Sequence, residues 1–246
     1  MTARVAFWRK QEAIGGGEEH ARGGRLSDFI LGAQDGLVNV LGVILGVAVA
    51  TSDLRIILVA GLAATFAESI SMGAVAYTST LARRDHYQSE RERELREMRE
   101  IPDAERREVR EILERWGFEG KQLEEMLEHI VSKEKAWLEI MMAHELNLAP
   151  VEDTQPRRSA LLVGVAAVIG SLIPLVPFLI PGLGIRNAMV VALSVSAVTL
   201  FIVGFYKARV TVGHPGRSGA QMAGIGIASA LAGFAIGFLL SVPTTV

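Results

Sequence analysis

Five long apolar stretches most constrain what this chain can fold into. A helix needs about 20 consecutive, mostly apolar residues to cross the hydrocarbon core of a bilayer. The 246-residue sequence meets this requirement at residues 26–50, 54–81, 160–180, 188–206 and 222–240. Because a membrane-spanning segment must satisfy its backbone hydrogen bonds internally, we expect each stretch to be helical. The sequence therefore predicts an all-α membrane protein with five transmembrane helices.

The charged residues are concentrated between the second and third apolar stretches. The block 83–158 holds 20 of the 27 acidic residues and 15 of the 25 Lys and Arg residues. Apolar residues recur within it at helical spacing, and Pro102 and the sequence GFEGK at 117–121 interrupt that spacing. We expect a continuation of the second span, then a helix over 103–116 and a helix over 121–146. The block is therefore predicted to be an aqueous three-helix insert.

This pattern divides the chain into four parts and predicts an orientation. The parts are an N-terminal arm, helices 1 and 2, the insert, and helices 3 to 5, at residues 1–25, 26–82, 83–158 and 159–246. Basic residues gather at the span ends on one side, whereas the two loops on the other side hold one arginine each. Because basic loops stay in the cytoplasm, we expect a cytoplasmic arm and insert and a C-terminus on the opposite side. No targeting signal is evident, so we expect the cell membrane, or an organellar membrane in a eukaryote.

Composition excludes or disfavours several classes of function. The sequence has no cysteine, which excludes disulfides, zinc–thiolate sites and thiol catalysis. It has no basic stripe with interleaved aromatic residues, so nucleic acid is not an expected partner. The apolar stretches contain no histidine, and the GxSxG and HExxH motifs are absent. We therefore do not expect an enzyme.

Two acidic residues interrupt the first two apolar stretches. Asp35 lies in the first, with Asn39 four residues later on the same helical face, and Glu68 lies in the second. A carboxylate near the bilayer centre costs several kcal/mol, and no Lys or Arg at this depth offsets it. Either a cation or protons visit these acids, or both are protonated and hydrogen-bonded to the backbone or to Asn39, Ser69 and Ser71. We favour a cation or proton path, because membrane helices rarely hold such residues without using them.

Met72 follows Glu68 by one helical turn. A methionine in an apolar helix usually packs, but beside a carboxylate its thioether is also a soft ligand. Oxygen and thioether together disfavour magnesium and calcium, and suit a transition metal such as Fe(II) or Mn(II). Packing and ligation both remain open for Met72.

The insert carries glutamates at spacings of three or four residues. Carboxylates at this spacing converge on one side of a helix and can chelate a cation. Such helices are also common as solvated surfaces laced with salt bridges, so that alternative stays open. A di-iron carboxylate bundle is disfavoured, because the residue three positions before each histidine of the insert is Arg or Met rather than Glu. The residues concerned are Glu90, Glu94 and Glu97, then Glu105 and Glu108, and then Met141, Met142 and Glu145.

Glycines four residues apart occur in the first and last spans. This spacing lets two helices approach closely. It serves packing within one chain and dimerisation equally well, so it does not decide between them. The pairs are Gly32 and Gly36, Gly42 and Gly46, and Gly233 and Gly237.

Four features extend over nearly the whole chain from Leu26 onward. They are DGL at 35–37, SISMGAVAY at 69–77, the Glu-rich insert and the three further spans. Together they resemble the vacuolar iron transporter family. The resemblance implies a homodimer of five-span protomers, with the first spans lining a path at the dimer interface. It also implies that the protein moves Fe(II), and often Mn(II), out of the cytoplasm in exchange for protons. Apart from the resemblance, Zn(II) is a further candidate substrate.

The resemblance also implies two sets of metal-site residues. Asp35 and Met72 would belong to a membrane metal site. The family commonly has a glutamate two turns before this methionine, where this chain has Ala64. Glu68, one turn before Met72, either replaces that glutamate as a ligand or mainly handles protons. The insert would be a metal-binding domain with ligands at Glu94, Glu97, Glu105, Glu108, Met141, Met142 and Glu145.

These observations favour transport over a membrane-anchored metal sensor or store. In the expected mechanism the insert captures Fe(II) and passes it to Asp35, Glu68 and Met72 of both protomers. Protons from the far side then neutralise the carboxylates and release the metal. A sensor or store would use the insert, but a bare membrane anchor has no use for Asp35 and Glu68.

Overall fold

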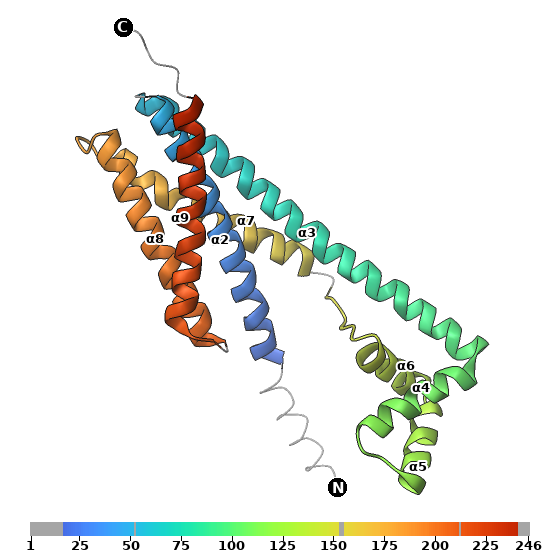
Figure 1. Ribbon diagram of the computed structural model, residues 1–246. Coiled ribbons are helices and arrows are strands. Elements are labelled where there is room, and N and C mark those ends of the chain that lie inside the picture. Colours follow the sequence, from blue (N-terminus) through green and yellow to red (C-terminus); the bar gives the residue numbers. More distant parts are fainter. Residues whose placement is uncertain (1–16, 52, 153–154, 212, 241–246) are drawn as a thin grey trace, which may run out of the picture. The chain divides into compact units, whose positions relative to one another are not determined.

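The described part of the chain is almost entirely helical. The computed structural model describes residues 17–51, 53–152, 155–211 and 213–240 (Figure 1). No strand occurs among these residues. The elements are α2 (Gly17–Ala50), α3 (Leu54–Glu100), α4 (Pro102–Arg115), α5 (Gly120–Val131), α6 (Glu134–Ile140), the π-helix η1 (Met141–Glu145), α7 (Gln155–Leu175), the 3₁₀-helix η2 (Val176–Leu179), α8 (Ile185–Val210) and α9 (Pro215–Leu240).

Five helical segments are long and apolar enough to cross a membrane. They are Leu26–Ala50 within α2, the helix α3, Gln155–Leu179 across α7 and η2, and the helices α8 and α9. The prediction of an all-α membrane protein with five spans is thereby confirmed. Helix α2 begins at Gly17, so residues 17–25 of the predicted arm continue the first spanning helix. Residues 1–16 of that arm lie outside the described part of the chain.

The chain divides into two compact units. The membrane unit comprises residues 1–77 and 157–246, and the insert unit comprises residues 78–156. Helix α3 belongs to both, because it runs as one helix from Leu54 to Glu100. The second span therefore continues into the insert without a break, as its sequence predicted.

Glycines bring α2 against α7 and α9 in the membrane unit. Gly32 and Gly36 lie against the backbone of α7. Gly42 and Gly46 lie against α9, where a Cβ added at Gly46 would meet the carbonyl oxygen of Gly233 at 2.7 Å. No side chain fits in so short a distance. The spaced glycines of the first span therefore serve packing within one chain.

The apolar core of the membrane unit is built around α2. Val40, Leu41 and Ile44 are buried there, together with Ile57 of α3 and Phe178 of η2. Helices α8 and α9 lie side by side, and both contact α2 (Figure 1). Because lipid tails are as apolar as these side chains, close packing rather than removal from water holds this core together.

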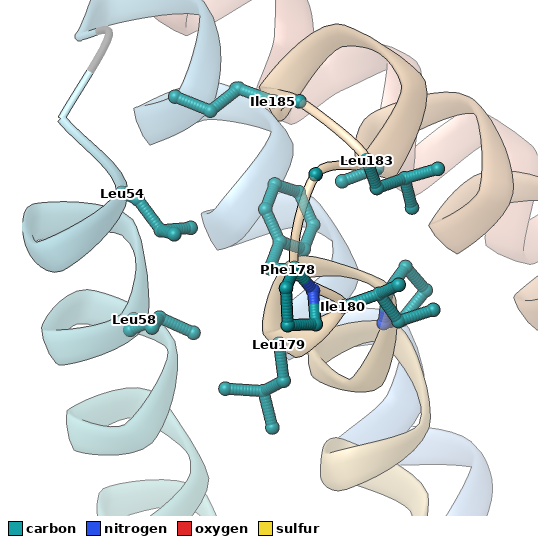
Figure 2. A pocket seen from close by; sticks show the side chains of 12 residues that line it. Leu54, Leu58, Phe178, Leu179, Ile180, Leu183 and Ile185 are labelled. Carbon is teal, nitrogen blue, oxygen red and sulfur yellow. The ribbon is translucent and has the colours of Figure 1, made fainter.

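A proline ends the α-helical part of the third span. Helix α7 stops at Leu175 and the 3₁₀-helix η2 follows. Pro177, within η2, has no backbone N–H with which to continue the α-helix. Beside this turn lies an apolar slot of about 370 Å³, which side chains of η2 and the following loop share with Leu54 and Leu58 of α3 (Figure 2). Within the described residues, this slot is lined by hydrophobic groups and carries no acidic side chain.

The insert unit has an apolar core of its own. Val109, Ile112 and Leu113 of α4 are buried with Leu127 of α5 and Met141 of η1. These residues recur at three- and four-residue spacing, which places them on one face of each helix. The core fixes α4, α5 and η1 relative to one another, and so positions the acidic side chains that these elements carry.

The prediction of one continuous helix over 121–146 is wrong. The structure instead has α5, α6 and η1, with a break between the first two. At the break the Ser132 hydroxyl donates a hydrogen bond to the His129 carbonyl oxygen at 2.9 Å, and Lys133 adopts an extended backbone. Side-chain bonds of this kind compete with helix continuation. No glycine or proline marks the break, so the hydrophobic periodicity predicts a helix that continues across it.

Candidate metal sites

Helices α2 and α3 bring two acidic side chains together inside the membrane unit. Asp35 lies on α2 and Glu68 lies on α3, and the carboxyl group of Glu68 interacts with the side chains of Asp35 and Asn39. Asp35 and Glu68 are both partly buried, whereas Asn39 is exposed on the surface of the single chain. The structure therefore joins the two acids that the sequence places on separate spans.

The hydroxyl groups of Ser69 and Thr65, near Glu68 on α3, bond to their own helix. Ser69 Oγ donates to the Thr65 carbonyl oxygen at 2.6 Å, and Thr65 Oγ1 donates to the Gly61 carbonyl oxygen at 2.8 Å. The Ser69 hydroxyl hydrogen is therefore already used, and it is not available to bond the intramembrane acids. The Ser71 hydroxyl, the Asn39 amide and the two carboxyl groups remain, and the carboxyl and amide oxygens are a set suited to a divalent cation.

Ala64, Glu68 and Met72 follow one another at four-residue spacing along α3 and so share a helical face. Ala64, where the resemblance leads one to expect a glutamate, packs against the apolar core of the membrane unit. Glu68 is thus the acid of α3 that meets Asp35. Met72 is half-buried one turn further on, and its role as a ligand stays a prediction.

A second group of acids lies in the insert unit. Glu94 of α3, Glu105 of α4 and Glu145 of η1 each offer a carboxylate oxygen, and these three oxygens lie within 4.8 Å of one another. Three different elements, the consecutive helices α3 and α4 and the later η1, therefore converge on one point. This spread suits three ligands of one divalent cation, whose oxygen ligands lie about 2.0–2.6 Å from the metal.

Two of these three acids are buried. Glu94 is 1% exposed and Glu105 is 3% exposed, whereas Glu145 opens to solvent. The Oε2 atoms of Glu94 and Glu105 have no hydrogen-bond partner among the described residues. Leaving a buried carboxylate without a partner costs several kcal/mol. A proton or a bound cation removes that cost, so burial prepares this cluster to bind one or the other.

Burial and mutual repulsion change the acidity of this cluster. Burial raises the pKa of Glu105 to about 8, and the negative charges of Glu108 and Glu94 add to the effect. Burial likewise raises the pKa of Glu145 to about 7, again with Glu108 and Glu94 as neighbours. The pKa of Glu94 is raised by burial and by the charge of Glu97. Near neutral pH the cluster therefore retains protons, which a metal ion must displace.

The other predicted ligands of the insert surround these three acids. Glu97 and Glu108 are half-buried, and their charges act on the buried acids. Met141 and Met142 are 0% and 3% exposed and pack into the apolar core of the insert unit. The structure thus shows Glu97 and Glu108 acting on the cluster and the two methionines in the apolar core, and the roles of all four as ligands stay predictions.

A π-helix presents Glu145 and the two methionines. In η1 the Leu146 N–H donates to the Met141 carbonyl oxygen five residues earlier, at 3.1 Å. The His144 ring contacts the Trp116 ring edge-on, with centroids 4.8 Å apart, which joins η1 to the end of α4. Single turns of π-helix occur frequently at functional sites. Amphipathic periodicity does not reveal such a turn, so the π-helix was not predicted from the sequence.

Sequence reasoning also missed Arg93. Its Nη2 atom lies 2.9 Å from Glu90 Oε2 and 3.7 Å from Glu94 Oε1, and its Nε atom lies 3.5 Å from Glu97 Oε2. The signal was present in the sequence, because Arg93 is three residues after Glu90 and four before Glu97. The charged face of this helix therefore contains a cation among its acids.

Five spanning helices, a pair of acids within the membrane unit and a buried carboxylate cluster in the insert unit define a polytopic helical membrane protein with two groups of acidic side chains. The model of the VIT family matches residues 26–238. The chain therefore belongs to the VIT family, as the resemblance of its sequence predicted.

Relatives of known name match over most of their length. The chain is 34% identical over 217 residues to vacuolar iron transporter 1 of Oryza sativa subsp. japonica, covering 87% of this chain and 86% of that protein. It is 37% identical over 218 residues to the vacuolar iron transporter of Centaurea cyanus, covering 88% and 89%. It is 30% identical over 219 residues to the vacuolar iron transporter of Toxoplasma gondii, covering 86% and 72%.

Proposed function

We propose that the protein transports Fe(II) out of the cytoplasm in exchange for protons, with Mn(II) and Zn(II) as further substrates. The observation that carries this proposal is the meeting of Asp35 and Glu68 between two spanning helices. An acid pair at membrane depth is costly unless a cation or protons use it. Relatives named as vacuolar iron transporters, 34% identical over most of the chain, support iron as the cargo.

Capture is the first proposed step and belongs to the insert unit. Glu94, Glu105 and Glu145 provide three carboxylate oxygens within 4.8 Å, with Glu145 open to solvent. The charges of Glu97 and Glu108 act on these acids, and we include both of them, with Met141 and Met142, in the proposed ligand set. Mixed carboxylate and thioether donors favour Fe(II) and Mn(II) over magnesium and calcium.

Passage through the membrane is the second proposed step. Asp35 and Glu68 form the oxygen side of the proposed intramembrane site, and Met72 adds a thioether one turn from Glu68. A proton and a metal ion compete for the same carboxylate oxygens. Protons that arrive from the far side therefore release the metal, and they also lower the cost of the emptied acid pair.

A homodimer completes the proposed assembly. Asn39 is exposed on the single chain although it belongs to a spanning helix and neighbours the acid pair. A polar side chain is costly against lipid, so a second copy that covers this face of α2 would remove the cost. We place the first spans at that interface, where they would line the path.

Orientation and location follow from the same proposal. We place the N-terminus and the insert in the cytoplasm and the C-terminus on the opposite side, because the basic loops fall on the insert side. The membrane would be the cell membrane, or an organellar membrane in a eukaryote, which the name of the vacuolar relatives supports. A membrane-anchored metal sensor or store is the alternative, and it leaves Asp35 and Glu68 without a use.

Uptake by proteoliposomes tests this function. Vesicles with an acidic interior should accumulate Fe(II) faster than vesicles without a pH gradient, and a smaller uptake of Mn(II) and Zn(II) is expected. Collapsing the gradient with a protonophore is the control. Uptake that ignores the gradient would rule out proton exchange. Absence of any metal uptake, in protein whose insert still binds metal, would favour the sensor or store.

A further inference from the structure

The insert unit contains a positively charged side chain, that of Arg93, beside its carboxylate cluster. Arg93 contacts three glutamates of α3 at once, with nitrogen–oxygen distances of 2.9 Å to Glu90, 3.7 Å to Glu94 and 3.5 Å to Glu97. Glu94 is one of the three acids that converge, and its side chain is 1% exposed. The Arg93 side chain is 44% exposed, so it reaches the cluster from solvent.

No other cation among the described residues pairs with these converging acids. The remaining arginine and lysine pairs of α4, α5 and α6 lie on exposed glutamates, as in the contact of Arg110 with Glu124 at 2.5 Å. Neither Glu105 nor Glu145 has an ion-pair partner in the described part of the chain. Arg93 is therefore the charge that offsets this cluster.

A metal ion at the cluster would share the carboxylate of Glu94 with this guanidinium, which faces Oε1, whereas Oε2 has no hydrogen-bond partner among the described residues. A metal ion about 2 Å from either oxygen of this carboxylate would therefore lie close to the guanidinium and bring two positive charges together. The guanidinium stays charged at every physiological pH, so it cannot withdraw by losing a proton. It can withdraw by rotating, because the Arg93 side chain is partly exposed to solvent.

We propose that Arg93 competes with divalent metal for Glu94 and Glu97 and thereby limits the affinity of the insert, which rests on the capture role proposed above. Metal binding displaces the guanidinium towards solvent, and its return favours release. A protein that passes ions onward must bind them strongly enough to collect them and weakly enough to let them leave. Arg93 supplies the second half of that requirement.

Binding of Mn(II) to the full chain in detergent tests this role. Asp35→Asn and Glu68→Gln together silence the intramembrane acids, so that titration reports on the insert. In this background Arg93→Gln should bind Mn(II) about tenfold more tightly, because a competing cation and a repulsive charge are both gone. Arg93→Lys keeps the charge and should remain near the affinity of the unchanged insert.

Arg96→Gln is the matched control. Arg96 lies on the same helix, is exposed, and forms no ion pair with a described residue. It should leave Mn(II) affinity within about twofold, whereas Arg93→Gln should also make that affinity fall more steeply with salt, because the site becomes more negative. Equal or weaker binding by Arg93→Gln would overturn the proposal, since Arg93 would then only hold the glutamates in place.

The same titration separates this proposal from the capture role on which it rests. Glu94→Gln and Glu105→Gln should each weaken Mn(II) binding if the cluster is the site. If they change nothing, the capture role fails and the role of Arg93 fails with it. If they weaken binding while Arg93→Gln does not strengthen it, capture stands and only the competition by Arg93 is refuted.

Discussion

Two buried acids, Glu94 and Glu105, distinguish the insert from an ordinary salt-bridged surface. On such a surface a glutamate is solvated and paired, as Glu124 is with Arg110 on the face between α4 and α5. Glu94 and Glu105 are instead almost fully buried, each with one carboxylate oxygen that lacks a partner among the described residues. The solvated-surface alternative therefore holds for Glu124 and fails for the two buried acids.

Replacing Glu105 should alter how stability depends on pH. Its pKa is raised from 4.5 to about 8, so between these values the folded chain holds a proton that the unfolded chain has lost. Stability in a chelator should therefore fall as pH rises from 4.5 to 8, by on the order of 5 kcal/mol from this group. Glu105→Gln should flatten that fall. Melting temperatures at pH 5.5 and pH 8 measure it, and an unchanged slope would contradict the assignment.

Single residues also mark the limit of sequence reasoning at this site. The spacing of glutamates along each helix was visible, and it placed Glu94, Glu105 and Glu145 among the candidates. Which of them meet in space depends on how α3, α4 and η1 pack, and helical spacing does not contain that information. The residue spacing alone could have predicted that Arg93 pairs with glutamates. An arginine among glutamates is typical of a solvated surface, however, and only the burial of Glu94 shows that this pair belongs to a buried cluster.

At the scale of elements, the glycines of α2 set how closely the membrane helices pack. Gly46→Ala should destabilise the fold by about 1–3 kcal/mol, because the new Cβ would meet the backbone of α9 at Gly233. Gly224→Ala is the matched control on α9, where nothing lies within 4 Å of an added Cβ. That change should be neutral or slightly stabilising. Equal melting temperatures for the two variants in detergent would contradict this packing.

The sequence predicted elements well where a signal was strong and local. Long apolar runs located the five spans, and Pro102 located the start of α4. The break between α5 and α6 carries no such signal, since it depends on a serine hydroxyl that bonds back to the His129 carbonyl. The sequence carries no signal for the π-helix either, because one extra residue in a turn leaves the apolar pattern of a short helix almost unchanged.

At the scale of the whole molecule, each unit holds its own group of acids. The membrane unit brings Asp35 and Glu68 together, and the insert unit brings Glu94, Glu105 and Glu145 together. Two separate groups fit a division of labour between collecting a cation and carrying it. Changes confined to one unit should therefore leave metal binding in the other intact, which Mn(II) titration of each variant can measure.

Fe(II) uptake by proteoliposomes containing Asp35→Asn tests the central claim most directly. The unchanged protein and Asp53→Asn, which alters an exposed acid in the loop before α3, should accumulate Fe(II) when the vesicle interior is acidic. The rate of Fe(II) uptake by Asp35→Asn should be lower by a factor of about ten or more, because its amide cannot carry the charge that balances a divalent cation. Its insert should still bind Mn(II) as before. Uptake by Asp35→Asn at the rate of the unchanged protein would show that the metal does not pass through the acid pair.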